Sequence, residues 1–141
     1  MLSSREAAED LAQEVFLQLH RSLVSIESDA HLAFWLRKVT ANRAIDRLRR
    51  QRQIETTSLD QAAEIPAVLA AGDPLLRRHL QKLILELAPA ARAVLLLRYQ
   101  EDLDPVEIAR TLDLPINTVK SHLKRSLAAL RDRMSVPVIE N

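Results

Sequence analysis

The stretch Asp104–Arg133 constrains the fold most, because its apolar residues follow the pattern of two helices separated by a tight turn. Asp104, Pro105 and Glu107 favour a helix start with an Asp-x-x-Glu capping box. Asp113 falls where the pattern is interrupted, and aspartate tolerates the left-handed backbone that such a turn requires. After this interruption the apolar residues recur at spacings of three and four, which predicts a second helix.

Each of these two helices is predicted to have one apolar and one polar side. The apolar residues are Val106, Ile108, Ala109 and Leu112 in the first helix, and Ile116, Val119, Leu123, Leu127 and Leu130 in the second. The other side of the second helix carries Thr118, Lys120, Ser121, Lys124, Arg125 and Arg131. A helix with hydroxyls and cations near its N-terminal half fits the major groove of DNA, because cations neutralise phosphates and donors contact base edges. The solvated face of an ordinary helical pair is the alternative.

The composition favours an all-α protein. The 141 residues include a single glycine and only 3% aromatic residues, whereas strands are rich in aromatic and β-branched residues. The absence of cysteine excludes disulfides and thiolate metal sites and suits a reducing cytoplasm. The four histidines lack the spacing of metal ligands, so we expect neither a metal nor another cofactor. No apolar run is long enough to cross a bilayer, and we expect no membrane insertion.

The formal net charge of +1 conceals strong local differences. Residues 37–53 hold seven basic side chains and one acidic, and residues 114–134 hold five basic and one acidic. Residues 1–36 and 54–76 each carry a net charge of −4. Because polyanion binding depends on local patches and not on the sum, this layout indicates two nucleic-acid-binding surfaces, with acidic surfaces left for protein partners.

Two further helices are predicted in the first third of the chain. The first runs from about Arg5 to Leu23, with an apolar stripe on one side and a polar side that faces solvent. A polar loop at residues 25–31 follows, in which Ser28 or Asp29 can cap the next helix. The expected stripe consists of Leu11, Ala12, Val15, Phe16, Leu19 and Leu23, and the polar side includes Asp10, Gln13, Glu14 and Gln18.

The helix after this loop, from about Leu32 to Arg52, is crowded with cations. Like charges on one helix repel each other, so the sequence accepts a loss of stability here. Phosphate binding is the simplest reason, because a guanidinium group can make two parallel hydrogen bonds to a phosphate; a merely solvated basic face is the alternative. The cations include Lys38, Arg43, Arg47, Arg49, Arg50 and Arg52, and the expected buried side holds Leu32, Trp35, Leu36, Val39, Ile45 and Leu48.

These patterns divide the chain into two helical modules. We predict a first module at residues 1–53, a linker at 54–74, a helix-turn-helix module at 75–134 and a tail at 135–141. The linker is marked by threonine, serine, proline and the single glycine, its charges are all acidic, and it holds at most a turn near Leu59–Ala63. In the second module, helices at 75–87 and 90–100 precede the helix-turn-helix.

In this order the motifs resemble those of the extracytoplasmic-function (ECF) sigma factors, the smallest class of the sigma-70 family of bacterial RNA polymerase. AEDLAQEVFLQLHRSL resembles the conserved helix of the second sigma region, and HLAFWLRKVTANRAIDRLRR is similar to the promoter-melting helix after it. ELAPAARAVLLLRYQEDL resembles the entry to the fourth region, and DPVEIARTLDLPINTVKSHLKRSLAALR its helix-turn-helix. Helix-turn-helices occur in many regulators, but the two regions together are specific.

The resemblance implies roles that periodicity alone does not assign. It places Thr118, Lys120, Ser121, Lys124 and Arg125 in the major groove of the minus-35 promoter element. It also places two groups of residues on the melted minus-10 element. The loop that receives a flipped-out base contributes Ile26, Ser28 and Asp29. The helix after this loop contributes Lys38, Asn42, Arg43, Arg47, Arg49 and Arg50. It implies that Asp10, Gln13 and Glu14 touch the clamp of the largest polymerase subunit, and that the region of Leu83, Leu87 and Leu95 meets the flap of the second-largest.

The sequence departs from the family pattern at its start. The family's second region opens with another long helix, whereas nine residues precede Asp10, so we expect a shortened N-terminus. Two helices cannot enclose both Phe16 and Trp35. We therefore expect an apolar patch that is covered by the second module, a second copy of the chain, an anti-sigma partner or upstream residues. The minus-10 region also lacks residues common in the family, having Ile26, Ser28 and Leu32 in their places.

We therefore expect a two-module, all-α sigma factor that directs core RNA polymerase to particular promoters by reading minus-35 duplex and minus-10 melted DNA. The expected partners are the clamp and flap of core polymerase, promoter DNA and an anti-sigma factor, all in the cytoplasm. We expect no enzymatic activity, because the sequence has no nucleophile–base pair, metal cluster or phosphate-binding loop. The alternatives are a helix-turn-helix regulator that does not engage polymerase and a helical interaction protein.

Overall fold

The structure, a computed structural model, describes residues 2, 4–55 and 73–135 and is helical in these parts of the chain, with no strand among them. The helices are α1 (Arg5–Ser22), α2 (Asp29–Glu55), α3 (Pro74–Glu86), α4 (Pro89–Tyr99), α5 (Pro105–Leu112) and α6 (Ile116–Ser135), and a short 3-10 turn, η1 (Leu23–Ser25), follows α1. This confirms the all-α class. The turn predicted near Leu59–Ala63 and the last six residues lie outside the described residues. Of the helices described, none combines the length and the apolar character needed to traverse a bilayer.

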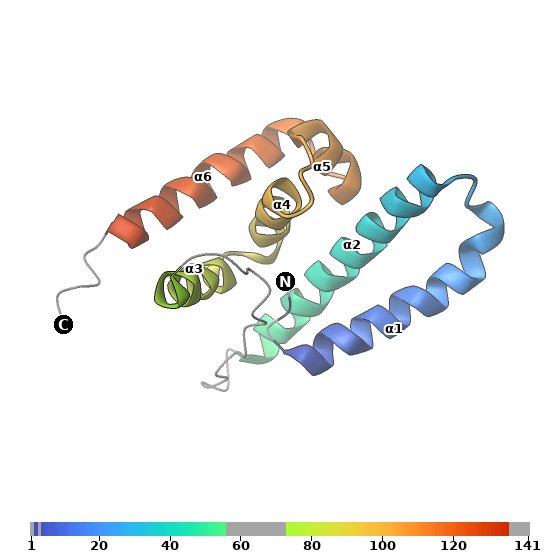
Figure 1. Cartoon of the computed structure of the whole chain (residues 1–141), viewed down its shortest axis with the longest axis horizontal. Helices are drawn as coiled ribbons and strands as arrows, with labels where there is room; N and C mark the ends of the chain where they lie inside the picture. The colour runs from blue at the N-terminus through green and yellow to red at the C-terminus, as the bar shows by residue number, and fades with distance from the viewer. Residues whose placement is uncertain (1, 3, 56–72, 136–141) are drawn as a thin grey trace.

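Helices α1 and α2 form an antiparallel pair (Figure 1). Ser4 caps α1, because its hydroxyl accepts a hydrogen bond from the Ala7 amide at 3.0 Å. Ser28 caps α2 in the same way, accepting from the His31 amide at 3.1 Å, so α2 begins three residues earlier than the apolar pattern predicted. The pair encloses a small core of Leu2, Leu11, Val15, Ala44 and Leu48, with Trp35, Leu36 and Val39 packed against it.

Helices α3, α4 and α6 form a second core, built on Leu83, Leu95 and Leu130. Two arginines hold the C-terminal turn of α3. The buried Arg92 donates from Nη2 to the carbonyl of Leu85 at 2.6 Å, and Arg52 of α2 donates from Nη2 to the carbonyl of Leu87 at 2.7 Å. Cations stabilise the negative end of a helix dipole. Burial, and secondly the charge of Arg52, lower the pKa of Arg92 to about 10, so Arg92 stays charged at neutral pH.

The helix-turn-helix of α5 and α6 has the local geometry that the sequence predicted. The Asp104 carboxylate accepts from the Glu107 amide at 2.8 Å, and the Glu107 carboxylate accepts from the Asp104 amide at 3.1 Å, which completes the capping box. Asp113 ends α5 in the left-handed region, with φ 57° and ψ 47°. Both features are local, so they could be predicted without knowing what the helices pack against.

Helix α2 is buried on two sides, because it also packs against α4 and α5 (Figure 1). Ala41 and Ile45 of α2 join a third core, which is completed by Ala93, Val94, Leu97, Leu103, Ile108, Leu112 and Val119 of the second module. The two helical modules therefore contact each other directly. Of the four coverings expected for the apolar surface of the first module, the second module is the one seen over this side of α2.

Five apolar residues that the periodicity placed on buried sides are exposed instead, namely Ala12, Phe16, Leu23, Val106 and Ile116. Phe16 and Leu23 are 61% and 52% exposed, because the side of α1 that packs on α2 is filled by Leu11 and Val15, and α1 has already ended where Leu23 begins η1. Val106 is 54% exposed, because Ile108 and Leu112 fill the inner side of α5. The sequence therefore has more apolar residues at helical spacing than the packed sides of the helices bury.

Candidate nucleic-acid interface

The N-terminal half of α6 presents one polar face to solvent. Lys120, Ser121, Lys124 and Arg125 are exposed, and Thr118 is half-buried. At 3.6 residues per turn these five residues span less than half of the circumference of the helix. Val119, Ser126 and Leu130, which are buried, lie on the opposite side. All five residues predicted for the minus-35 element therefore share one accessible face.

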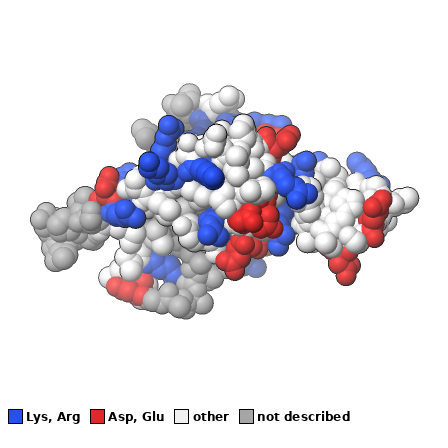
Figure 2. All heavy atoms as spheres, turned by 90° about the horizontal axis from the view of Figure 1, so that it is seen from above, with Lys and Arg blue, Asp and Glu red and all other residues white. Residues whose placement is uncertain are grey.

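The side of the molecule where α5 and α6 lie is rich in cations. Figure 2 looks onto this side and shows Lys and Arg groups spread across it, with a group of Asp and Glu near the middle. Cations displace counterions from phosphates, and hydroxyl and amine donors contact base edges in the major groove. The face of α6 has the chemistry and the exposure that contact with duplex DNA requires.

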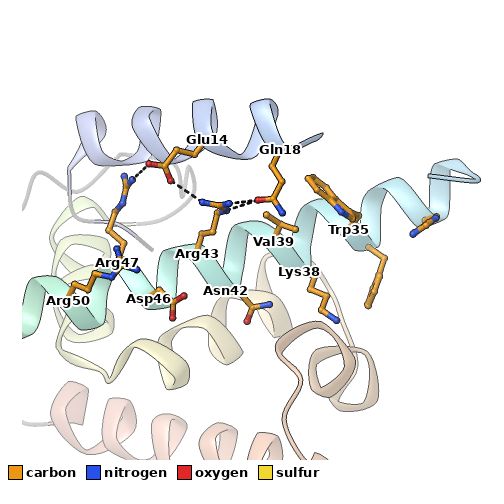
Figure 3. Close-up of a pocket in the computed structure, with 12 residues that line it drawn as sticks. Glu14, Gln18, Trp35, Lys38, Val39, Asn42, Arg43, Asp46, Arg47 and Arg50 are labelled. Atoms are coloured by element: carbon orange, nitrogen blue, oxygen red, sulfur yellow. Dashed lines mark hydrogen bonds and ion pairs between the residues drawn. The ribbon is translucent and has the colours of Figure 1, made fainter. Parts of the chain in front are cut away.

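A groove of about 740 Å³ lies along α2 where it meets α1 (Figure 3). Its lining includes five of the nine residues predicted for the minus-10 element, namely Lys38, Asn42, Arg43, Arg47 and Arg50. Arg49 is exposed outside this lining, as are Ser28 and Asp29, and Ile26 is half-buried there. In Figure 3, Lys38, Asn42 and Asp46 point away from α1, whereas Arg43 and Arg47 reach towards it.

Three ring side chains, His31, Phe34 and Trp35, also line the groove. Sequence analysis placed Trp35 in the core and assigned no role to His31 or Phe34, although rings interleaved with the cations of one helix were visible in the sequence. The ammonium group of Lys38 lies 5.8 Å from the centroid of the Phe34 ring. Rings beside cations in one groove can stack on unpaired bases while the cations hold the phosphates, which is how single-stranded nucleic acids are bound.

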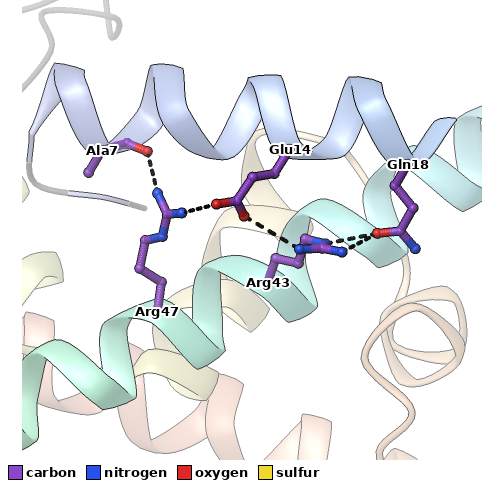
Figure 4. Close-up of polar contacts among 5 residues, drawn as sticks. All are labelled: Ala7, Glu14, Gln18, Arg43 and Arg47. Carbon is purple, nitrogen blue, oxygen red and sulfur yellow. Dashed lines mark hydrogen bonds and ion pairs between the residues drawn. The ribbon is translucent and has the colours of Figure 1, made fainter. Parts of the chain in front are cut away.

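A polar network from α1 holds two arginines of this groove (Figure 4). Glu14 pairs with Arg47 through Oε1 and Nη2 at 2.7 Å, and with Arg43 through Oε2 and Nη1 at 3.4 Å. Arg43 also donates from Nε to the Gln18 side-chain oxygen at 2.9 Å, and Arg47 donates to the carbonyl of Ala7 at 3.0 Å. Glu14 is exposed, as the sequence predicted, with 46% of its side chain accessible, but its carboxylate also bridges two arginines, which the sequence did not predict.

The network orients the arginines more than it stabilises the fold. Ion pairs between partly exposed side chains contribute roughly 0–1 kcal/mol to stability. Their effect on charge is larger, because one carboxylate offsets part of the positive potential of both guanidinium groups. On the same helix, Asp10 and Gln13 are exposed, as predicted for the polar side of α1.

In the loop before α2, some polar groups form hydrogen bonds with the first turn of α2. The Ser28 hydroxyl caps α2, and the Glu27 amide donates to Nδ1 of His31 at 3.2 Å. Asp29 is the first residue of the helix. A base received by this loop would meet a surface whose shape these contacts fix.

Comparison with known proteins shows the family of the chain. Residues 1–54 match the family described as Sigma-70 region 2, and residues 77–130 match the family described as Sigma-70, region 4. The ECF RNA polymerase sigma factor SigW of Bacillus subtilis is 29% identical, with 95% of this chain and 79% of SigW covered. The ECF RNA polymerase sigma factor SigK of Mycobacterium tuberculosis is 30% identical, with 92% of this chain and 73% of SigK covered. The chain belongs to the ECF sigma factors of the sigma-70 family.

A solved structure supports the fold of this ECF sigma factor. The sigma factor RpoE of Bartonella quintana, determined in complex with the anti-sigma factor NepR, superimposes with a TM-score of 0.74. The match covers 96% of this chain and 86% of RpoE, at 21% sequence identity. The likeness therefore extends over both helical modules.

Within the sigma factor, each proposed DNA surface falls inside one matched region. The face of α6 lies in the part that matches region 4, and the groove on α2 lies in the part that matches region 2. Sequence reasoning found neither the bridge from Glu14 to Arg43 and Arg47 nor the hydrogen bond from Arg52 to α3. Both join residues far apart in the chain, and no spacing along a helix signals such pairs.

Proposed function

We propose that this ECF sigma factor directs core RNA polymerase to specific promoters, reading the minus-35 duplex with α6 and the melted minus-10 strand with α2. The observation that carries the proposal is the pair of cationic surfaces, one in each matched sigma region. The chemistry of each surface suits a different form of DNA. The protein acts by binding, and we assign it no catalytic residue.

For the minus-35 element, α6 supplies a face of the right width. Lys120 and Lys124 are separated by one turn, so both can reach the same stretch of backbone or base edges. Ser121 and Arg125 repeat this spacing on the adjacent row. Contacts of this kind to bases each contribute about 1–3 kcal/mol of discrimination against the wrong base.

For the minus-10 element, the groove on α2 combines guanidinium groups, rings and an amide. The guanidinium groups attract any phosphate and carry no sequence information, whereas the Asn42 amide can pair with a base edge once the strands have separated. Trp35 and Phe34 offer ring faces to unstacked bases. Arg49 and Arg50, both exposed, are suited to the flanking phosphates.

The protein partners follow from the surfaces that remain. We assign the polymerase clamp to the α1 face of Asp10, Gln13 and Glu14, and the polymerase flap to the second module. Leu83 and Leu95 are buried in the core of that module, so Leu87, which is half-buried, is the better candidate of the three for the flap. An anti-sigma factor is a further expected partner, and core polymerase and promoters place these interactions in the cytoplasm.

Run-off transcription tests the proposal. Purified protein is added to core polymerase and to DNA fragments from the genome of its source, and the transcripts are sequenced. A sigma factor gives transcripts that start at defined sites and share two upstream elements. A helix-turn-helix regulator without sigma activity binds duplex DNA but yields no such transcripts with core enzyme alone, and that result would overturn the proposal.

A further inference from the structure

Ser28 and His31 form a reciprocal pair of hydrogen bonds at the start of α2. The Ser28 hydroxyl accepts from the His31 amide at 3.1 Å, and Nδ1 of His31 accepts from the Glu27 amide at 3.2 Å. In the common capping box, a glutamate or glutamine stands three residues after the serine, and its side chain accepts from the backbone at the helix start. His31 occupies this position. An imidazole nitrogen therefore takes the place of a carboxylate or amide oxygen.

The contact from Glu27 to His31 depends on protonation, unlike the contacts on either side of it. At the other end of the loop, the Ile26 amide donates to the carbonyl of Leu23 at 3.2 Å, and neither of these peptide groups titrates. An imidazole nitrogen can accept a hydrogen bond only when it carries no proton. Histidine is also the ordinary side chain that changes its charge between about pH 5 and pH 8. Protonation of His31 therefore removes one of the bonds that hold this loop.

The bond lies within the proposed minus-10 surface. Glu27 stands between Ile26 and Ser28, which are both predicted to contact the minus-10 element, so fixing the Glu27 amide also orients its two neighbours. His31 is half-buried and lines the groove on α2, together with two other ring side chains. The imidazole therefore connects the loop expected to receive a flipped-out base with the groove proposed for the melted strand.

Charged groups from several parts of the fold surround this site. Glu27 and Asp29 belong to the loop and the helix start, Glu14 reaches the groove from α1, and Arg110 of α5 lies 5.6 Å from the ring of Phe34. The charged groups of α2 along the groove are Lys38, Arg43, Asp46, Arg47 and Arg50. Carboxylates, ammonium and guanidinium groups ordinarily keep their charge between about pH 6 and pH 8. Within this site, a change of pH over that range therefore acts through the imidazole.

We propose that His31 is a positioning residue for minus-10 recognition, whose neutral imidazole holds the loop in the conformation that receives the base and whose protonation releases it. The proposal deepens the proposed function and rests on it. The imidazolium also adds a positive charge to the groove, which attracts phosphates of any sequence. Acidification therefore lowers the preference for the cognate minus-10 element while it raises the non-specific attraction for DNA.

Transcription at two pH values tests the role of His31. Core polymerase and the sigma factor are given the cognate promoter, found by the run-off experiment above, or the same promoter with a scrambled minus-10 element. The ratio of the two transcripts should fall by about three- to tenfold from about pH 8 to pH 6, because one hydrogen bond to the loop is lost. Using a ratio removes the effect of pH on the polymerase itself.

His31→Gln is the decisive variant, because glutamine accepts hydrogen bonds at this position and does not titrate. Its ratio should stay high at both pH values, whereas that of His31→Ala should be low at both. His20→Gln, at an exposed site on α1, is the matched control and should lose preference on acidification as the wild type does. A wild-type ratio that does not change with pH would overturn the positioning role, and so would an equal fall in His31→Gln.

Nuclear magnetic resonance tests the contact without transcription. In the free protein, the amide resonance of Glu27 should shift together with the ring resonances of His31 as the pH is lowered, and in His31→Gln it should not. A Glu27 amide that ignores the titration of the ring would also overturn the proposal. If the wild-type protein gives no promoter-dependent transcript, the proposed function fails, and the resonance titration still decides whether His31 holds the loop.

Discussion

Glu14 of α1 and Arg47 of α2 form an ion pair with 2.7 Å between Oε1 and Nη2, although the sequence assigned them to different partners. The same carboxylate reaches Arg43 at 3.4 Å. An acid expected at the polymerase clamp thus offsets part of the positive potential of two cations expected at the minus-10 strand. Any substitution of Glu14 therefore changes both the proposed clamp surface on α1 and the proposed minus-10 groove on α2. Experiments on the clamp surface should therefore keep Glu14 unchanged.

Glu14→Gln should strengthen binding of single-stranded DNA by the free protein. Without the carboxylate, no negative charge at this position offsets the potential of Arg43 and Arg47, and both guanidinium groups lose an ion pair that competes with phosphates. If one further phosphate contact forms, the slope of log affinity against log salt should steepen by about 0.7 for a single strand. The measurement is a salt titration of the affinity for a fluorescent oligonucleotide.

Glu9→Gln is the matched control, because it removes one negative charge and one ion pair, that with Arg5 at 3.1 Å, from the same helix. A gain in Glu14→Gln no larger than that in Glu9→Gln would mean that net charge and not the release of the two arginines is responsible.

Asp10→Ala with Gln13→Ala should weaken the capture of core polymerase. Both side chains are exposed on α1, so their removal should leave the helix content unchanged. Glu14 keeps its side chain in this test, because its loss would also disturb Arg43 and Arg47. The measurement is a pull-down with core enzyme, together with circular dichroism. Undiminished capture would show that Asp10 and Gln13 do not contact core polymerase and that this face of α1 is an ordinary solvated surface.

The sequence predicted what depends on neighbours along the chain. The capping box of Asp104 and Glu107, the left-handed Asp113 and the cap at Ser28 all depend on residues at most four positions apart. The polar face of α6 followed from the same helical spacing. These predictions needed no information about the partner surface of any helix.

What the sequence did not predict depends on which surfaces meet. Ile45 was placed on a single buried side of its helix, but α2 is buried on two sides, and Ile45 and Ala41 face the second module. Phe16 has the spacing of a core residue and is exposed, because the side of α1 that meets α2 is already filled. Periodicity shows that a residue is apolar at a helical position, but not whether another helix covers that position.

Ile108 and Val106 test this distinction within α5. Ile108 is fully buried, whereas Val106 is 54% exposed. Ile108→Ala should lower the free energy of unfolding by about 2–5 kcal/mol, because it removes buried methyl groups and leaves a cavity. Val106→Ala should change it by less than about 1 kcal/mol, as expected for an exposed position away from the core. Denaturant unfolding measures both, and similar losses would contradict the assigned burial.

Lys124→Ala with Arg125→Ala should reduce the preference for the cognate minus-35 element. Each base contact that is lost should cost on the order of 1–3 kcal/mol. Transcription is compared between a cognate promoter and one with a scrambled minus-35 element. Arg131→Ala is the control, because it removes a cation that is exposed on the same helix beyond the proposed contacts. A double variant that prefers the cognate promoter as strongly as wild type would refute base readout by these residues.

Asn42→Ala should impair strand opening and leave initial binding of the duplex intact. Asn42 is half-buried in the groove on α2, and in Figure 3 it points away from the arginines held by α1. A neutral amide adds nothing to phosphate attraction, but it can donate a hydrogen bond to the edge of an unpaired base and accept one from it.

Permanganate reactivity of thymines at the minus-10 element measures strand opening, and band-shift affinity measures duplex binding. Thr40→Ala, an exposed substitution on the same helix, should leave both unchanged. Normal thymine reactivity with Asn42→Ala would show that the melted strand is held by the guanidinium groups and rings alone.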